Sequence, residues 1–246
     1  MEKNPSSAEP RIFATTHWSA VLAVQDEDPV RAQAALEELC RAYWHPLYSY
    51  LRRQGFAPPD AEDLIQGFFH ELLALHALHK AEPGRGRFRA FLIGCLKKFV
   101  ARQHRRAGQE KRGGGQGIFS LDIPNAEQHY GKLLATGSET PDQVYERQWA
   151  ANLLGKALDA LRSEAEARGQ AGVFKHLQCT LSGEDPSASY AELAARLGLS
   201  ESAVKMAALR LRERFAVLFR GEIARTVDRP EEVEEEIAHL FRVLAR

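Results

Sequence analysis

Residues 189–215 read SYAELAARLGLSESAVKMAALRLRERF, and they carry the most specific structural signal of the chain. Ser189 and Glu192 make the S-x-x-E pattern of a capping box, which marks the start of a helix. Gly198 stands where the left-handed residue that ends this helix is expected. Ser200 is a favourable N-cap for a second helix. The stretch therefore predicts two helices joined by a tight turn.

The second of these helices is predicted to have one buried and one exposed face. The apolar residues at helical spacing are expected to face the core, and they are Val204, Ala208, Leu211 and Phe215, joined by Leu199 from the turn. The residues expected to face outward are Ser202, Lys205, Met206 and Leu209, with Arg210 beside them. This arrangement is typical of a helix-turn-helix, whose second helix enters the DNA major groove. An αα-hairpin in a helical bundle is the alternative, and the basic residues Arg210, Arg212 and Arg214 favour DNA binding.

Charge is unevenly distributed along the 246 residues, although 33 basic and 33 acidic side chains give a net charge of zero. Residues 85–112 carry a net charge of +9 and residues 205–225 a net charge of +4. The compensating acid lies before, between and after these two segments. Because a phosphate backbone responds to the local field, the two basic segments predict contact with nucleic acid. The alternative for either segment is a solvated helix face.

Apolar residues recur at helical spacing through most of the chain, so we predict an all-α protein. Pro46 is expected to kink or split the first long helix. Three consecutive glycines, Gly113 to Gly115, predict a linker, and residues 118–123 form the one plausible strand. We predict two helical domains joined by a flexible linker, with the domains at 15–112 and 141–225, the linker at 113–140 and an acidic C-terminal helix at 226–246.

The first basic segment has the composition of a nucleic-acid contact. Its basic residues are Arg85, Arg87, Arg89, Lys97, Lys98, Arg102, Arg105, Arg106, Lys111 and Arg112, interleaved with Phe88, Phe91 and Phe99. Basic side chains bind phosphates, and exposed aromatic rings stack on unpaired bases. The helical spacing of the three phenylalanines favours core positions instead.

Three segments together resemble bacterial RNA polymerase sigma factors of the sigma-70 superfamily, in the extracytoplasmic-function (ECF) group. Residues 60–69 (DAEDLIQGFF) resemble region 2.2, residues 88–106 resemble regions 2.3 and 2.4, and residues 189–215 resemble region 4.2. The order also fits, because this group keeps domains σ2 and σ4 joined by a flexible linker. The opening residues 13–19 and the tail are similar to a longer subgroup with a C-terminal extension.

The resemblance implies a role for each segment. Docking on core polymerase is implied for Asp60, Glu62, Asp63, Gln66 and Phe69. Binding of the −10 promoter element is implied for Arg85, Arg87, Arg89, Lys97, Lys98, Arg102, Arg105 and Arg106. Reading of the −35 element is implied for Ser202, Lys205, Met206, Arg210 and Arg212. The sequence departs from the family at Gly67, where an acidic residue is common, and at Lys98 and Arg102, where Asn and Asp are common.

Nothing in the sequence points to an enzyme. The pair His70-Glu71 is followed by Ala74 where the H-E-x-x-H zinc motif needs histidine, and neither glycine-rich segment has the ending of a phosphate-binding loop. Cys40, Cys95 and Cys179 lack metal or redox spacing. We therefore expect no catalytic residues, no cofactor and no metal. A polar N-terminus and the absence of an apolar run of about 18 residues predict a cytoplasmic protein without a membrane span.

These observations favour a sigma factor that binds core RNA polymerase and directs promoter recognition, DNA melting and transcription initiation. The alternatives are a stand-alone helix-turn-helix regulator that binds duplex operators and an adaptor with charged helical faces. The expected partners are core RNA polymerase and promoter DNA, and an anti-sigma factor or other regulatory protein stays open. The acidic tail either packs on the C-terminal domain or covers a basic surface with its carboxylates.

Overall fold

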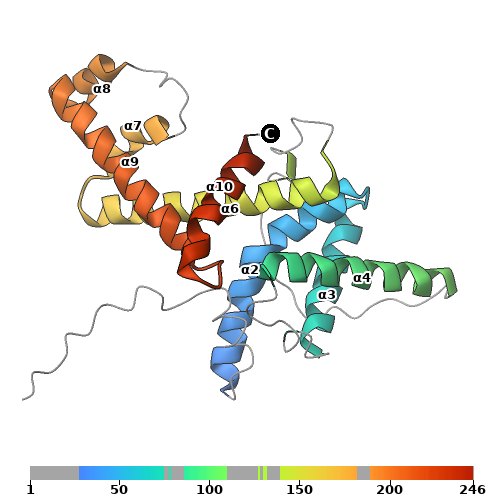
Figure 1. Cartoon of the computed structure of the whole chain (residues 1–246). Coiled ribbons are helices and arrows are strands. Elements are labelled where there is room, and N and C mark those ends of the chain that lie inside the picture. Colours follow the sequence, from blue (N-terminus) through green and yellow to red (C-terminus); the bar gives the residue numbers. More distant parts are fainter. Residues whose placement is uncertain are drawn as a thin grey trace, which may run out of the picture. The chain divides into compact units, whose positions relative to one another are not determined.

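The protein is helical throughout the part of the chain that the structure, a computed structural model, describes (Figure 1). The described residues are 28–74, 78, 86–109, 127, 130–131, 139–181 and 189–245, and they contain no strand. The predicted all-α class is confirmed for these residues. The strand expected at 118–123 and most of the linker lie outside them. The chain divides into two compact units, Met1–Tyr145 with Ala224–Glu232, and Glu146–Ile223 with Val233–Arg246.

Among the described residues, the first unit contains the helices α2 (Pro29–Arg53), α3 (Pro58–Ala74) and α4 (Phe88–Gln109). The side chain of Asp28 caps α2 by accepting a hydrogen bond from the backbone N–H of Val30 at 3.0 Å. α2 continues as one helix across Pro46, so the proline does not split it.

Apolar faces of the three helices form the core of this unit. The buried residues include Tyr43, Leu47 and Leu51 of α2, Ile65 and Phe68 of α3, and Leu92, Leu96 and Phe99 of α4. The ring of Tyr43 meets Phe88 edge-on with centroids 5.4 Å apart, and Phe68 meets Phe99 in the same way at 5.8 Å. Edge-to-face pairs of this kind are favoured by the charge distribution of aromatic rings.

Gly67 lies where α3 comes close to α4. A Cβ atom at this position would stand 3.3 Å from the Cζ atom of Phe99. That distance is tighter than ordinary van der Waals contact, so the absence of a side chain lets the helices approach. The glycine in place of the common acidic residue therefore has a packing reason.

The remaining elements follow in the order α6 (Pro141–Ala167), α7 (Ala171–Leu177), η2 (Gln178–Leu181), α8 (Tyr190–Leu197), α9 (Glu201–Ala224), η3 (Pro230–Glu232) and α10 (Val233–Leu244). A reciprocal cap opens α6, because Thr140 N–H donates to Gln143 Oε1 at 2.8 Å and Gln143 N–H donates to Thr140 Oγ1 at 3.3 Å. Most of α6, with α7, α8, nearly all of α9 and α10, belongs to the second unit.

The acidic tail forms an amphipathic helix within the second unit. Val233, Leu240 and Val243 of α10 are buried, and the ring of Phe241 lies 6.3 Å from that of Phe219 in α9. Glu234 forms an ion pair with Arg220 of α9. α10 thus packs on α9 through apolar contacts and adds a charge contact at its start.

Candidate nucleic-acid interface

The helix pair α8–α9 has the geometry that its sequence predicts. Glu192 N–H donates to Ser189 Oγ at 3.2 Å, and Ser189 N–H donates to Glu192 Oε2 at 2.7 Å, so the capping box is complete. Gly198 adopts the left-handed conformation with φ 65° and ψ 29°. Ser200 Oγ accepts a hydrogen bond from Ala203 N–H at 3.2 Å and caps α9. The turn between the helices is therefore short and tied at both ends.

Buried apolar residues hold the two helices together. Leu193 and Ala194 of α8 pack with Val204 of α9 and Leu177 of α7 in one core cluster. Leu199 was expected to join this core, and that expectation is wrong because its side chain is 45% exposed. Its backbone N–H still completes the helix end by donating to Ala194 O at 3.1 Å.

The start of α9 presents the predicted outward residues. Ser202, Lys205, Met206, Leu209 and Arg210 are all exposed. Lys205 pairs with Glu201 at 2.7 Å, and this hydrogen bond raises the pKa of the Lys205 ammonium group. Met206 and Leu209 make the face partly apolar, with exposed fractions of 48% and 45%. A mixed face of this kind can contact phosphates, base edges and thymine methyl groups.

Arg212 differs from these residues because its guanidinium is engaged within the protein. Its Nε donates to the backbone oxygen of Thr180 at 3.0 Å, and its Nη2 donates to the hydroxyl of Tyr190 at 3.1 Å. These bonds tie α9 to η2 and to the start of α8. Arg212 therefore supports the helix pair in the free chain.

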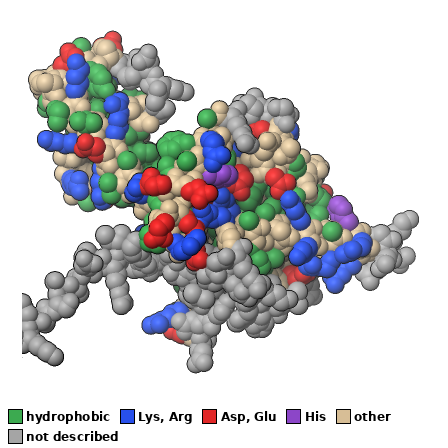
Figure 2. All heavy atoms as spheres, in the orientation of Figure 1, with side chains coloured by type: hydrophobic (Ala, Val, Ile, Leu, Met, Phe, Trp, Pro, Cys, Tyr) green, Lys and Arg blue, Asp and Glu red, His purple; other side chains and the backbone are tan. Residues whose placement is uncertain are grey.

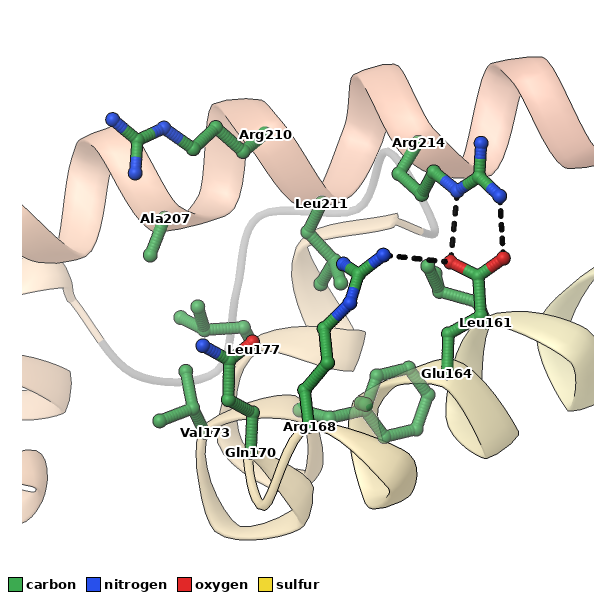
Figure 3. Close-up of a pocket in the computed structure, with 12 residues that line it drawn as sticks. Leu161, Glu164, Arg168, Gln170, Val173, Leu177, Ala207, Arg210, Leu211 and Arg214 are labelled. Atoms are coloured by element: carbon green, nitrogen blue, oxygen red, sulfur yellow. Dashed lines mark hydrogen bonds and ion pairs between the residues drawn. The ribbon is translucent and has the colours of Figure 1, made fainter.

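A cavity of about 310 Å³ lies between α6, α7 and α9 within the second unit (Figure 3). Glu164 in its wall accepts a hydrogen bond from Arg214 Nε at 2.8 Å and lies 3.7 Å from Arg168 Nη2. The hydrogen bond from Arg214 holds the pKa of the Glu164 carboxyl below its usual range. Arg210, from the same helix as Arg214, points away from Glu164 (Figure 3). Three arginines against one glutamate leave the lining with excess positive charge.

From its middle to its C-terminal end, α4 carries exposed cations of the first basic segment. Lys98, Arg105 and Arg106 are exposed, and Figure 2 shows basic side chains gathered over this end of the helix. Within the described residues these three side chains take part in no ion pair. Positions 98, 102, 105 and 106 share one helical face, so α4 presents a basic stripe.

Three other cations of this segment are paired with carboxylates of the protein. Arg87 pairs with Glu232, Lys97 with Asp142 at 2.6 Å, and Arg102 with Glu71 of α3. None of these carboxylates is predicted as a site residue from the sequence, although the acidity of the tail is a signal for Glu232. Charge along the chain cannot show which acid meets which base, because the partners are far apart in sequence.

Arg89 and Arg85 are the two remaining residues predicted to bind the −10 element. Arg89 is 6% exposed, so its side chain is not presented to solvent, and its backbone oxygen accepts a hydrogen bond from the Tyr145 hydroxyl at 3.0 Å. Arg85 lies outside the described residues. Phe88 and Phe99 are buried as expected for core residues, and Phe91 is half-buried. Because their rings are buried, Phe88 and Phe99 are not available to stack on unpaired bases.

The start of α3 presents an acidic face. Asp60, Glu62 and Asp63 are exposed, and none of the three joins an ion pair with another described residue. Gln66 is half-buried beside them. Phe69 is 5% exposed and its ring stacks on Trp44 with centroids 6.2 Å apart. The helical spacing places Phe69 in the core, so the side chain supports α3 from behind and is not available at its surface.

No group of three His, Cys, Asp or Glu side chains in the described part of the chain could hold a metal ion. Among the helices described, none combines the length and the apolar character needed to cross a membrane.

Comparison with known proteins identifies one segment. Residues 39–110 match the family model for sigma-70 region 2. This range covers α2 from Leu39 onward, all of α3 and α4, and the basic stripe. No curated protein and no solved structure matches the chain. The match identifies a sigma-70 region 2 domain within the first unit.

Proposed function

We propose that this chain, which carries a sigma-70 region 2 domain at residues 39–110, is a sigma factor of the ECF type. It would bind core RNA polymerase in the cytoplasm and direct promoter recognition, DNA melting and transcription initiation without being an enzyme itself. The observation that carries the proposal is the region 2 match followed, later in the chain, by two capped helices joined by a tight turn.

The basic stripe on α4 supports a role in promoter melting. Lys98, Arg105 and Arg106 lie in the matched region, are exposed and form no ion pair with a described residue, so they can bind phosphates of a separated strand. A melted base must be held as it leaves the stack, and protein contacts offset the free energy of unstacking. We therefore assign binding of the −10 element to this face of α4.

The start of α9 supports recognition of the −35 element. Ser202, Lys205, Met206 and Arg210 are exposed on the first turns of the second helix, which is the part of a helix-turn-helix that reaches base edges. Arg212 is assigned a supporting role in this proposal, because its guanidinium holds Thr180 and Tyr190.

The acidic face at the start of α3 is assigned to polymerase docking. Asp60, Glu62 and Asp63 lie on the exposed face at the start of α3, and none of them forms an ion pair with another described residue. Acidic residues also favour a helix N-terminus, so these charges contribute to helix stability as well. A regulator that binds operators alone has no need of such a surface.

Run-off transcription with purified core RNA polymerase and genomic promoter fragments tests the function. We expect the full chain to associate with core polymerase and to yield promoter-specific transcripts. A variant with Asp60→Asn, Glu62→Gln and Asp63→Asn should lose most of this association. The matched control removes three exposed carboxylates without described ion pairs elsewhere, Glu38→Gln, Glu166→Gln and Glu213→Gln, and should retain it.

The same experiment separates the sigma factor from the other classes. Binding to duplex DNA without association with polymerase would instead support the stand-alone regulator. Association with neither would leave an adaptor as the remaining class. An anti-sigma factor or other regulatory protein stays a prediction.

A further inference from the structure

The chain returns to the first unit after α9. Residues 224–232 group with α2, α3 and α4, whereas α9 before them and α10 after them belong to the second unit. Thr226 and Val227 are 5% and 3% exposed, so the segment is packed against protein. We call residues 224–232 the return segment.

The return segment ends on a carboxylate held by two guanidinium groups. Glu232 pairs with Arg87, and its Oε1 accepts a hydrogen bond from Arg229 Nε at 3.0 Å. Burial alone would raise the pKa of Glu232, but the hydrogen bonds from Arg229 and Arg87 outweigh it and hold the pKa below its usual range. Glu232 is therefore ionised at neutral pH.

Arg87 lies immediately before the first residue of the basic helix α4. It directly precedes Phe88, and its backbone oxygen accepts hydrogen bonds from Ala90 N–H at 3.0 Å and Phe91 N–H at 3.3 Å. The Arg87 side chain is 22% exposed and that of Glu232 is 21% exposed, so the pair is partly shielded from water. Such shielding makes an ion pair stronger than a fully exposed one.

A guanidinium binds carboxylates and phosphates with the same planar fork of N–H donors. A phosphate that binds the guanidinium of Arg87 must therefore displace Glu232 from it. We propose that Glu232 is an intramolecular competitor of DNA phosphate at Arg87, so that the return segment weakens DNA binding by the free chain. This inference rests on the proposed function, because it takes Arg87 as a DNA contact.

Other carboxylates of the tail are placed differently. Glu234 pairs with Arg220 of α9, and Glu236 is 2% exposed within the second unit. Glu231 is exposed and takes part in no ion pair among the described residues. Glu231 is therefore a matched control, because Glu231→Gln removes the same charge one residue away.

The test compares full-chain variants in their affinity for a fluorescent single-stranded oligonucleotide, measured by anisotropy at low salt. We expect Glu232→Gln to bind about three to ten times more tightly than the wild type, and Glu231→Gln to change affinity less than twofold. Arg87→Gln should bind more weakly. Adding Glu232→Gln to Arg87→Gln should give no further gain, because the competed group is gone.

Hydrogen exchange on the wild-type chain provides a second measurement that needs no variant. Saturating oligonucleotide should lower the protection of backbone amides in residues 225–232. Unchanged protection in the DNA-bound state would overturn the proposal. So would a Glu232→Gln affinity no higher than that of Glu231→Gln, or an equal gain in the Arg87→Gln background.

Failure of this inference and failure of the proposed function give different results. Promoter-specific transcripts with no effect of Glu232→Gln would remove only the competition. No DNA binding by any variant, together with no transcript, would overturn both.

Discussion

At the residue scale, the cations of α4 differ in what they are free to bind. Lys98 and Arg105 are exposed without ion pairs among the described residues, whereas Lys97 and Arg102 already have carboxylate partners. A free cation offers its full charge to a phosphate. A paired cation must first lose its partner, which reduces the net gain from DNA.

The free cations of α4 should therefore contribute most to binding of melted DNA. We expect Lys98→Ala with Arg105→Ala to weaken binding of single-stranded DNA several-fold and to reduce the log–log salt slope by about 0.7 for each lost phosphate contact. Titration at several salt concentrations checks this. Lys175→Ala, an exposed lysine of α7, is the control and should leave the slope unchanged.

Gly67 is a second residue whose role depends on its surroundings. Glutamate at position 67 would press on Phe99, whereas a Cβ atom at Gly94 of α4 meets nothing within 4 Å. We expect Gly67→Glu to have a free energy of unfolding about 1–3 kcal/mol lower than Gly94→Glu, because both changes gain helix propensity and only the first overpacks the core. Urea unfolding of both variants measures the difference, and equal effects would contradict close packing at Gly67.

At the element scale, α9 separates residues that read DNA from residues that hold the helix in place. Lys205 projects from the exposed first turns, and Arg212 binds Thr180 and Tyr190. The two side chains lie seven residues apart on one helix. Their different surroundings give each a distinct expected phenotype.

We expect Lys205→Ala to weaken promoter binding several-fold while leaving the thermal unfolding midpoint unchanged, because the side chain is exposed. Arg212→Ala should lower the unfolding free energy by about 1–3 kcal/mol, because two partners lose a charged donor. Affinity for promoter duplexes and thermal unfolding of both variants test whether Lys205 contacts DNA and Arg212 supports the fold. An unchanged affinity for Lys205→Ala would show that another face of α9 meets DNA.

At the scale of the whole molecule, buried contacts and ion pairs between distant elements hold each unit. Arg52 binds Glu127 through bonds of 2.8 and 3.0 Å, and Arg214 binds Glu164. The hydrogen bond from its arginine holds the pKa of each glutamate below the ordinary value of 4.5. Both pairs therefore link stability to pH.

The sign of this linkage follows from where protons bind. The unfolded chain takes up protons at a higher pH than the folded chain, so the stabilisation is complete above the ordinary pKa and is lost as pH falls through the folded values. We expect a flat urea midpoint near neutrality and a decline below about pH 5. Glu164→Gln should be less stable at neutral pH and show a shallower decline, whereas Glu166→Gln, an exposed neighbour, should follow the wild type.

Local sequence was sufficient for the parts of the fold that depend on neighbouring residues. The capping box at Ser189, the left-handed turn at Gly198 and the buried stripe through Val204 and Ala208 all follow the predicted pattern. Caps, turns and helical periodicity involve residues within about four positions of each other, so their energetics are readable along the chain. Leu199 departs from this pattern, because the direction of a side chain after a turn depends on what packs around it.

The local charge that a DNA strand would meet was decided by the tertiary structure. Arg87, Lys97 and Arg102 meet carboxylates that are 145, 45 and 31 residues away in the chain. Because charges interact through space, the amino-acid sequence shows two basic segments but not which of their cations are already paired. The order of residues thus predicts that the protein has basic helical surfaces. The tertiary structure determines that Lys98, Arg105 and Arg106 form no ion pair with a described residue, whereas Arg87 is paired with Glu232.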